Sequence, residues 1–220
     1  MPRQARTRPS RRLLLAASAM LLALPIASMA TTASAAPPEP SPVPVTWEFD
    51  FREGPLRLVT VDVPGVGPRA YFYLTFTITN FWGGELLYAP EFQMKTEEGD
   101  VLTSGQNVPP QVTEYILNLL NNPLIDDQIQ ILGPVLEGVE NAKSGVVIWP
   151  ANDLDVDEIM VFAANLSGEH TIFWTKDPKT HERKRIVLRK TLMLRYDTPG
   201  EIAGRGARPL DLVEKRWIMR

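Results

Sequence analysis

The chain contains no cysteine and only two histidines, His170 and His181, among its 220 residues. The absence of cysteine excludes disulfide-stapled scaffolds, thiolate zinc and iron–sulfur sites, thiol catalysis and anchoring through a lipid-modified cysteine. The spacing of the two histidines suits neither a helical metal pair nor a zinc-protease motif. Phosphate-binding glycine loops, dinucleotide fingerprints and serine nucleophile elbows are also missing. The composition, 44% hydrophobic and 22% charged, is nevertheless that of a globular protein.

The first 36 residues have the three-part layout of a secretory signal peptide. Residues 1–12 carry five arginines and no acid, residues 13–26 are apolar and uncharged, and Ala33-Ser34-Ala35 supplies the small residues that a signal peptidase requires. An apolar run of this length is too short to cross a bilayer core of about 30 Å, which disfavours an uncleaved anchor. The run Ser10-Arg11-Arg12-Leu13 resembles a twin-arginine signal, so both the Sec and the twin-arginine routes stay open. We therefore expect an exported protein, periplasmic or secreted.

Charge is distributed unevenly along the chain. The formal net charge is −3, but removal of the predicted signal peptide leaves 18 basic against 26 acidic residues, a net charge of −8. Residues 37–170 carry 5 basic and 20 acidic residues, whereas residues 171–220 carry 13 basic and 6 acidic residues. An acidic processed chain argues against general binding to nucleic acid or anionic membranes. The two parts either neutralise each other as neighbouring strands of one domain or form a bipolar surface for a charged partner.

The remainder of the chain has the pattern of a β-rich domain. Residues 37–44 are rich in proline and predict an extended linker, which leaves 45–220 as the folded domain. Residues 70–79 alternate most clearly, with Phe72 and Leu74 on one face and Tyr71 and Tyr73 on the other. Short runs of this kind, separated by turn residues, favour an antiparallel sandwich or barrel. The predicted strands are 45–51, 56–63, 70–79, 86–96 (interrupted at Pro90), 145–149, 158–164, 171–176, 186–196 and 210–217.

Residues 107–143 break this pattern and predict a helical insertion. Val112, Ile116 and Leu119 share one face of a helix, which Asn121-Asn122-Pro123 should stop. A second short helix is expected to begin at Asn122, which can cap it, and to end before Gly133. The insertion either plugs an open end of the sandwich, which would account for every apolar position, or serves as a lid or a pair of docking helices.

The strand motif resembles immunoglobulin-like modules of exported bacterial proteins. In those modules an alternating strand ends in Asn at a hairpin, as the run from Tyr71 to Asn80 does. A strand with a Phe and an acidic-Gly turn then follows, and Phe92 and Glu98-Gly99-Asp100 match this continuation. The resemblance implies an immunoglobulin-like antiparallel β-sandwich and no catalytic residues, although the short α-helical insertion departs from a simple seven-strand topology. Further segments similar to exported bacterial proteins of unknown function are 147–150, 161–162, 165–168 and 188–196.

Three alternating acids form the one candidate metal site. Asp153, Asp155 and Asp157 could supply oxygen ligands to calcium, a hard cation suited to exported proteins. Two features of an EF-hand loop are missing, since Glu158 stands at the sixth position in place of Gly and Ala164 at the twelfth in place of Glu. The simpler interpretation is an acidic loop that leads into the next strand.

Two clusters are candidates for binding a partner. Phe81-Trp82 lies in a predicted turn, where the pair could stack on a sugar ring, dock a partner or fold back over the sandwich end. Arg183-Lys184-Arg185 stands in a stretch, 176–190, that holds seven basic residues. Those charges either protect a hairpin edge from aggregation or contact an anionic glycan or protein.

These observations predict a non-enzymatic extracytoplasmic module, for binding or structure, that contacts protein or glycan without a cofactor. No nucleic acid and no stable membrane span after processing are expected. The alternative is an extracytoplasmic hydrolase whose active site is assembled only by the fold, because any fold can host such a site without a sequence motif.

Overall fold

The computed structural model describes residues 38–97, 99, 101–177, 179–198, 202–206 and 208–220. The predicted signal peptide, and Glu98 and Asp100 of the predicted acidic turn, lie outside these residues. Within them, no helix is long and apolar enough to cross a membrane. The elements are β1 (Phe49–Val63), β2 (Gly67–Asn80), β3 (Leu86–Tyr88), β4 (Glu91–Thr96), β5 (Val101–Thr103), α1 (Pro110–Leu120), β6 (Ile125–Asp127), β7 (Gly133–Val135), η1 (Val139–Asn141), β8 (Lys143–Pro150), β9 (Glu158–Ala164), β10 (His170–Lys176), β11 (Arg183–Asp197), η2 (Ile202–Arg205) and β12 (Asp211–Met219).

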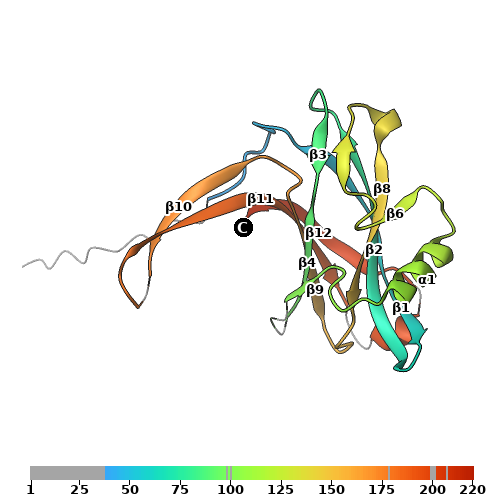
Figure 1. The fold of residues 1–220 in the computed structure, drawn as a ribbon. Coiled ribbons are helices and arrows are strands. Elements are labelled where there is room, and N and C mark those ends of the chain that lie inside the picture. The colour runs from blue at the N-terminus through green and yellow to red at the C-terminus, as the bar shows by residue number, and fades with distance from the viewer. Residues whose placement is uncertain (1–37, 98, 100, 178, 199–201, 207) are drawn as a thin grey trace, which may run out of the picture. The chain divides into compact units, whose positions relative to one another are not determined.

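Two larger sheets and one short ribbon make up the strands (Figure 1). The first sheet has the order β1-β2-β8-β6, and its first three strands are antiparallel. The second has the order β10-β11-β9-β4-β5, with β12 paired to β11 as well. Strands β3 and β7 pair only with each other. The prediction of a mainly β protein with a short helix is confirmed.

The main core lies between the two larger sheets. Alternation along β2 points Phe72, Leu74 and Phe76 into this core, as the sequence predicted. They meet Phe92 and Met94 of β4, and Phe76 lies 5.1 Å from Phe92 between ring centroids. Apolar side chains from both sheets therefore form one buried layer, an arrangement consistent with a β-sandwich.

Strand β1 joins the last three residues of the predicted strand 45–51 to the whole of the predicted strand 56–63, and residues 45–48 lie before it. The residues between the two predicted strands, Glu53-Gly54-Pro55, form an irregularity within β1. There the register with β2 shifts between Glu53 and Leu56. Gly54 is required there, since a Cβ atom would lie 2.1 Å from Oγ1 of Thr75. One long edge strand results, and it forms part of the candidate site.

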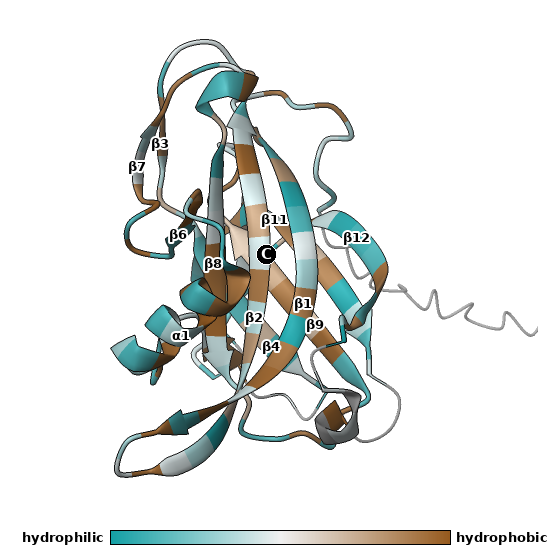
Figure 2. Ribbon diagram, turned by 90° about the vertical axis from the view of Figure 1, so that its right-hand side faces the viewer, coloured by the Kyte–Doolittle hydropathy of each residue, from teal (hydrophilic) through white to brown (hydrophobic). Residues whose placement is uncertain are grey.

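Helix α1 covers the outer face of the first sheet (Figure 2). Val112 and Ile116 are buried against Tyr71 and Tyr73, so β2 is covered on both faces. The prediction that the insertion plugs an open end was therefore wrong for α1. A later residue of the insertion, Ile131, is buried in the main core.

The predicted second helix does not form. Ile125–Asp127 is the short strand β6, which pairs in parallel with β8. Oδ1 of Asp127 accepts hydrogen bonds from the backbone N–H groups of Ile129 and Gln130 at 2.7 and 2.9 Å. This local turn competes with a helix for the same backbone groups.

Strand β10 and the first half of β11 form a hairpin that extends away from the two sheets (Figure 1). We call this hairpin, residues 170–189, the arm. Its side chains are exposed or partly exposed at every residue of the arm that the structure describes. The second half of β11 is buried and lies between β9 and β12. A single strand thus links the core to an uncovered projection.

Candidate functional site

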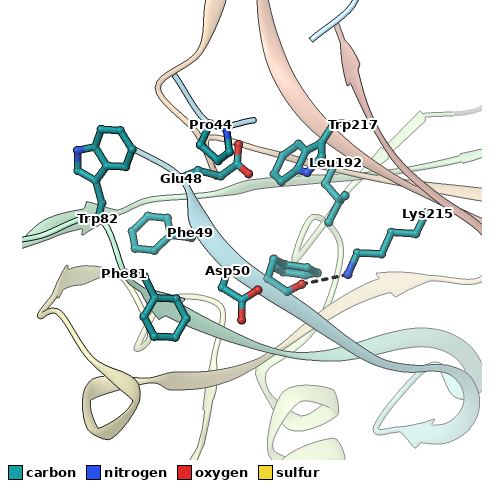
Figure 3. A pocket seen from close by; sticks show the side chains of 10 residues that line it. Pro44, Glu48, Phe49, Asp50, Phe81, Trp82, Leu192, Lys215 and Trp217 are labelled. Atoms are coloured by element: carbon teal, nitrogen blue, oxygen red, sulfur yellow. Dashed lines mark hydrogen bonds between the residues drawn. The ribbon is translucent and has the colours of Figure 1, made fainter. Parts of the chain in front are cut away.

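A groove opens between the edge strand of each larger sheet, β1 and β12 (Figure 3). Its volume is about 540 Å³, which is within the range of small-molecule sites. Aromatic rings stand on both sides, and two carboxylates lie between them. The lining residues are Pro44, Glu48, Phe49, Asp50, Phe51, Phe81, Trp82, Leu192, Lys215 and Trp217.

Phe81 and Trp82 form the wall of the groove that follows β2. They are 55% and 48% exposed, so the pair does not fold back over the sandwich end. Asn80, which is fully buried, holds the turn in shape. Its Nδ2 donates to the carbonyl oxygens of Gly84 at 2.7 Å and Val135 at 3.0 Å, and its Oδ1 accepts from Trp82 N at 3.0 Å. The two rings are therefore presented by a turn that is already ordered.

Trp217 and Lys215 of β12 form the opposite wall. Lys215 Nζ donates to the carbonyl oxygen of Phe51 at 3.1 Å and forms an ion pair with Glu53. This contact occupies a backbone acceptor on the free edge of β1 and joins the two edge strands. The groove is consequently bounded by two strands that are tied to each other.

A buried ammonium lies beneath the groove. Lys190 is 1% exposed, and its Nζ lies 2.9 Å from Glu48 Oε2 and 3.2 Å from Glu169 Oε2. It also donates to the carbonyl oxygen of Ser41 at 3.0 Å and lies 5.2 Å from the centre of the Trp217 ring. Burial raises the pKa of Glu169, but hydrogen bonds from Ser41 and Lys190 outweigh it, so the net pKa is lowered. The cluster fixes the position of Glu48 in the groove.

Each charged group of the groove already has a partner. Glu48 pairs with Lys190, Asp50 with Arg52 at 3.1 Å, and Lys215 with Glu53. Carboxylates held in this way can still accept hydrogen bonds from hydroxyl groups, and flat rings can stack on an apolar ligand face.

The structure separates the residues predicted as sites. Phe81 and Trp82 line the groove. Arg183, Lys184 and Arg185 lie on the arm.

Asp153, Asp155 and Asp157 follow β8 in an irregular loop, and Asp153 Oδ1 accepts from the backbone N–H of Asp155 at 2.9 Å. No group of three or more His, Asp or Glu side chains placed to share a metal ion occurs among the described residues. The three aspartates are therefore not assembled as a calcium site.

Sequence reasoning missed Glu48, Asp50, Lys215 and Trp217. They come from two segments more than 150 residues apart, and only the pairing of β12 with β11 brings them together. The one usable signal was Trp217, an aromatic residue in a charged strand. Both histidines are exposed on the arm and neither lines the groove.

Comparisons with protein-family models, with curated protein sequences and with solved structures find no match to this chain. The chemistry of the groove and of the arm therefore carries the functional conclusion.

Proposed function

We propose that this protein is a non-enzymatic, extracytoplasmic binding module and that its groove takes a glycan. The observation that carries the proposal is the ordered aromatic turn, in which buried Asn80 presents Phe81 and Trp82 to an open groove. A pre-ordered turn loses little conformational entropy when a ligand binds.

The chemistry of the lining favours a sugar over a peptide. The groove has a volume of about 540 Å³, which is in the range of small-molecule sites. A stable protein interface is instead a broad surface that buries about 800 Å² on each partner. Trp82 and Trp217 offer flat faces on opposite sides, and Glu48 and Asp50 offer acceptors between them. A pyranose has apolar faces and a rim of hydroxyl donors, which matches this distribution.

The ion pairs support binding rather than hydrolysis. A hydrolase needs an acid or base that is free to exchange a proton with the substrate. Here Glu48 is held by a buried ammonium and Asp50 by Arg52. The buried pair fixes Glu48 as a hydrogen-bond acceptor for a ligand in the groove.

We also propose an immunoglobulin-like topology for the sandwich. The orders β1-β2-β8-β6 and β5-β4-β9-β11 follow the chain order of the A-B-E-D and C′-C-F-G sheets of that class. The parallel pairing of β6 with β8 and the added strands β10 and β12 are departures. In such domains binding residues commonly lie on loops and edges around the core.

Affinity electrophoresis tests the glycan proposal. The protein is run through gels that contain neutral polysaccharides, acidic polysaccharides or solubilised peptidoglycan. At least one gel should retard the wild-type protein. Trp82→Ala should weaken that binding about tenfold or more, because a stacked aromatic ring is lost.

Tyr115→Ala is the matched control, since Tyr115 is similarly exposed but lies on α1, away from the groove and the arm. It should leave the retardation unchanged. Retardation by none of the gels, or an equal loss in both variants, would refute the groove as the binding site.

A further inference from the structure

The arm presents apolar side chains on both of its faces. Cross-strand pairing places Ile172 and Val187 on one face, next to Trp174, and Phe173 with Ile186 on the other. The three side chains of the first face are between 43% and 53% exposed. No residue from 170 to 189 is buried among those that the structure describes.

An uncovered two-stranded ribbon of this kind is poorly stabilised by itself. Such hairpins are marginal in water unless a third strand or another surface packs on them. The outer edge of β10 pairs with no described strand, and on the other side of the arm only its last residue, Arg189, is paired, through two backbone hydrogen bonds with Arg220. Among the described residues, nothing covers either face of the arm or the outer edge of β10, which is typical of an element covered by a partner.

The arm is also strongly basic. Residues 170–189 hold six basic and two acidic side chains. One of the basic side chains, Arg183, lies 5.2 Å above the ring of Trp174. The surface that covers the arm should thus combine apolar side chains with negative charge.

The same chain carries a surface with those properties on the β3–β7 ribbon and η1. Leu87, Leu136 and Val139 are 53–72% exposed there. Glu85 and Glu137 are exposed beside them, together with Glu140, and none of these carboxylates forms an ion pair with another described residue. Residues 81–94 and 133–142 contain no basic residue. We call this surface the acidic ribbon.

We infer that the arm of one copy of the protein packs on the acidic ribbon of a second copy. Figure 1 shows the acidic ribbon at one end of the sheets and the arm running off to one side, so the two surfaces lie apart within one copy. Contact of two arms would bring like charges together, whereas arm and ribbon are complementary in both charge and apolar character. Two different patches meet, so the association is heterologous and builds rings or chains of copies.

Sedimentation velocity of the processed protein tests this inference. The sedimentation coefficient should rise with protein concentration at low salt. High salt should weaken the association about tenfold or more, because the attraction between exposed charges is screened.

A charge exchange identifies the surfaces. Arg183→Glu with Arg185→Glu should abolish self-association, and so should Glu137→Lys with Glu140→Lys. An equimolar mixture of these two variants should associate again, because each restores the missing complement. Arg69→Glu with Arg216→Glu is the control, since it makes the same change of charge at exposed sites away from the arm and should associate as the wild type does. Circular dichroism confirms that each variant is folded.

Three results would overturn the inference. One is that the wild-type protein stays monomeric at every concentration. The basic residues of the arm would then serve only to protect its edge from aggregation. Another is a mixture of the two folded variants that does not associate. The third is a monomer that co-sediments with vesicles of phosphatidylglycerol and phosphatidylcholine, which would assign the arm to an anionic membrane. Glycan retardation by the groove does not depend on any of these outcomes, because the groove is lined neither by the arm nor by the exposed apolar and acidic side chains of the acidic ribbon.

Discussion

Two buried polar side chains, Asn80 and Lys190, support opposite walls of the groove. Asn80 fixes the turn that carries Trp82, and Lys190 lies beneath Trp217 and beside Glu48. Burial of a polar group costs free energy unless the group is hydrogen-bonded. A substitution at either residue should therefore change both the shape of the groove and the stability of the fold.

Asn80→Ala should lower the free energy of unfolding by about 2–3 kcal/mol, because the buried carbonyl of Val135 and the N–H of Trp82 lose their partner. Urea denaturation measures the change. Asn152→Ala, at an exposed site, should change the stability by less than about 0.5 kcal/mol. An equal effect of both substitutions would show that Asn80 does not order the turn. Glycan binding should fall with Asn80→Ala, since Trp82 is then no longer held.

Lys190→Met should lower the free energy of unfolding by about 3–5 kcal/mol at neutral pH, because Glu48 and Glu169 are left without their cation. The folded-state pKa of Glu169 is below its ordinary value of 4.5, so its contribution to stability is present above that pH and is lost as the pH falls through the folded-state pKa. Without Lys190, the hydrogen bonds from Ser41 still lower this pKa, but the contribution of the ammonium is lost, so the pKa of Glu169 is higher in the variant than in the wild type.

The difference in unfolding free energy between wild type and Lys190→Met should therefore shrink on acidification below about pH 4.5. Denaturation curves at neutral and acidic pH measure it. Lys190→Met combined with Glu169→Gln should recover part of the loss. A difference that is independent of pH would mean that the lost packing of the lysine, and not its charge, explains the effect.

At the scale of elements, α1 acts as a cover and not as an end plug. Ile116→Ala should lower the free energy of unfolding by about 2–5 kcal/mol, because Ile116 is buried against the outer face of the first sheet. Leu119 was predicted to share the buried face of this helix, but it is 49% exposed, so Leu119→Ala should change the stability by less than about 0.5 kcal/mol. Thermal or urea denaturation compares the two. Similar values for both would contradict the packing of α1.

The sequence predicted elements well where one local pattern decided them. The alternation of residues 70–79 correctly predicted β2, and the stripe at Val112 and Ile116 correctly predicted α1. The prediction failed where a local signal competed with tertiary pairing. The capping residues around Asn122 suggested a second helix, but the pairing of β6 with β8 and the turn at Asp127 determined the structure. For the groove, Phe81-Trp82 was visible as an exposed aromatic pair. Its opposite wall depends on the strand order, which no local pattern encodes.

At the scale of the whole molecule, the absence of cysteine means that no disulfide supports the fold. Stability depends on apolar burial, and a domain of about 180 residues can bury roughly 70% of its unfolded surface. The uneven charge also has a spatial counterpart, because the basic arm projects away while acidic side chains lie on the acidic ribbon. Pairing between neighbouring strands of the domain therefore does not neutralise all of the uneven charge.

Export is the property of the whole molecule that the N-terminal sequence predicts. Leu21→Arg with Leu22→Arg should keep the chain in the cell as the 24.6 kDa precursor, because two charges interrupt the apolar segment of the signal peptide. The wild-type chain should leave the cytoplasm and start near Pro37, which N-terminal sequencing of the exported protein checks. Leu21→Val with Leu22→Val keeps the segment apolar and should be exported normally.

The absence of disulfides does not decide between the two export routes, so the arginine pair has to be tested separately. Loss of export on changing Arg11 and Arg12 to Lys would identify the twin-arginine route, because that route recognises the pair itself. Undiminished export would identify the Sec route, for which lysine supplies the same positive charge. Recovery of the unprocessed wild-type chain from the cytoplasm would contradict export altogether, and with it the extracytoplasmic setting of the glycan proposal.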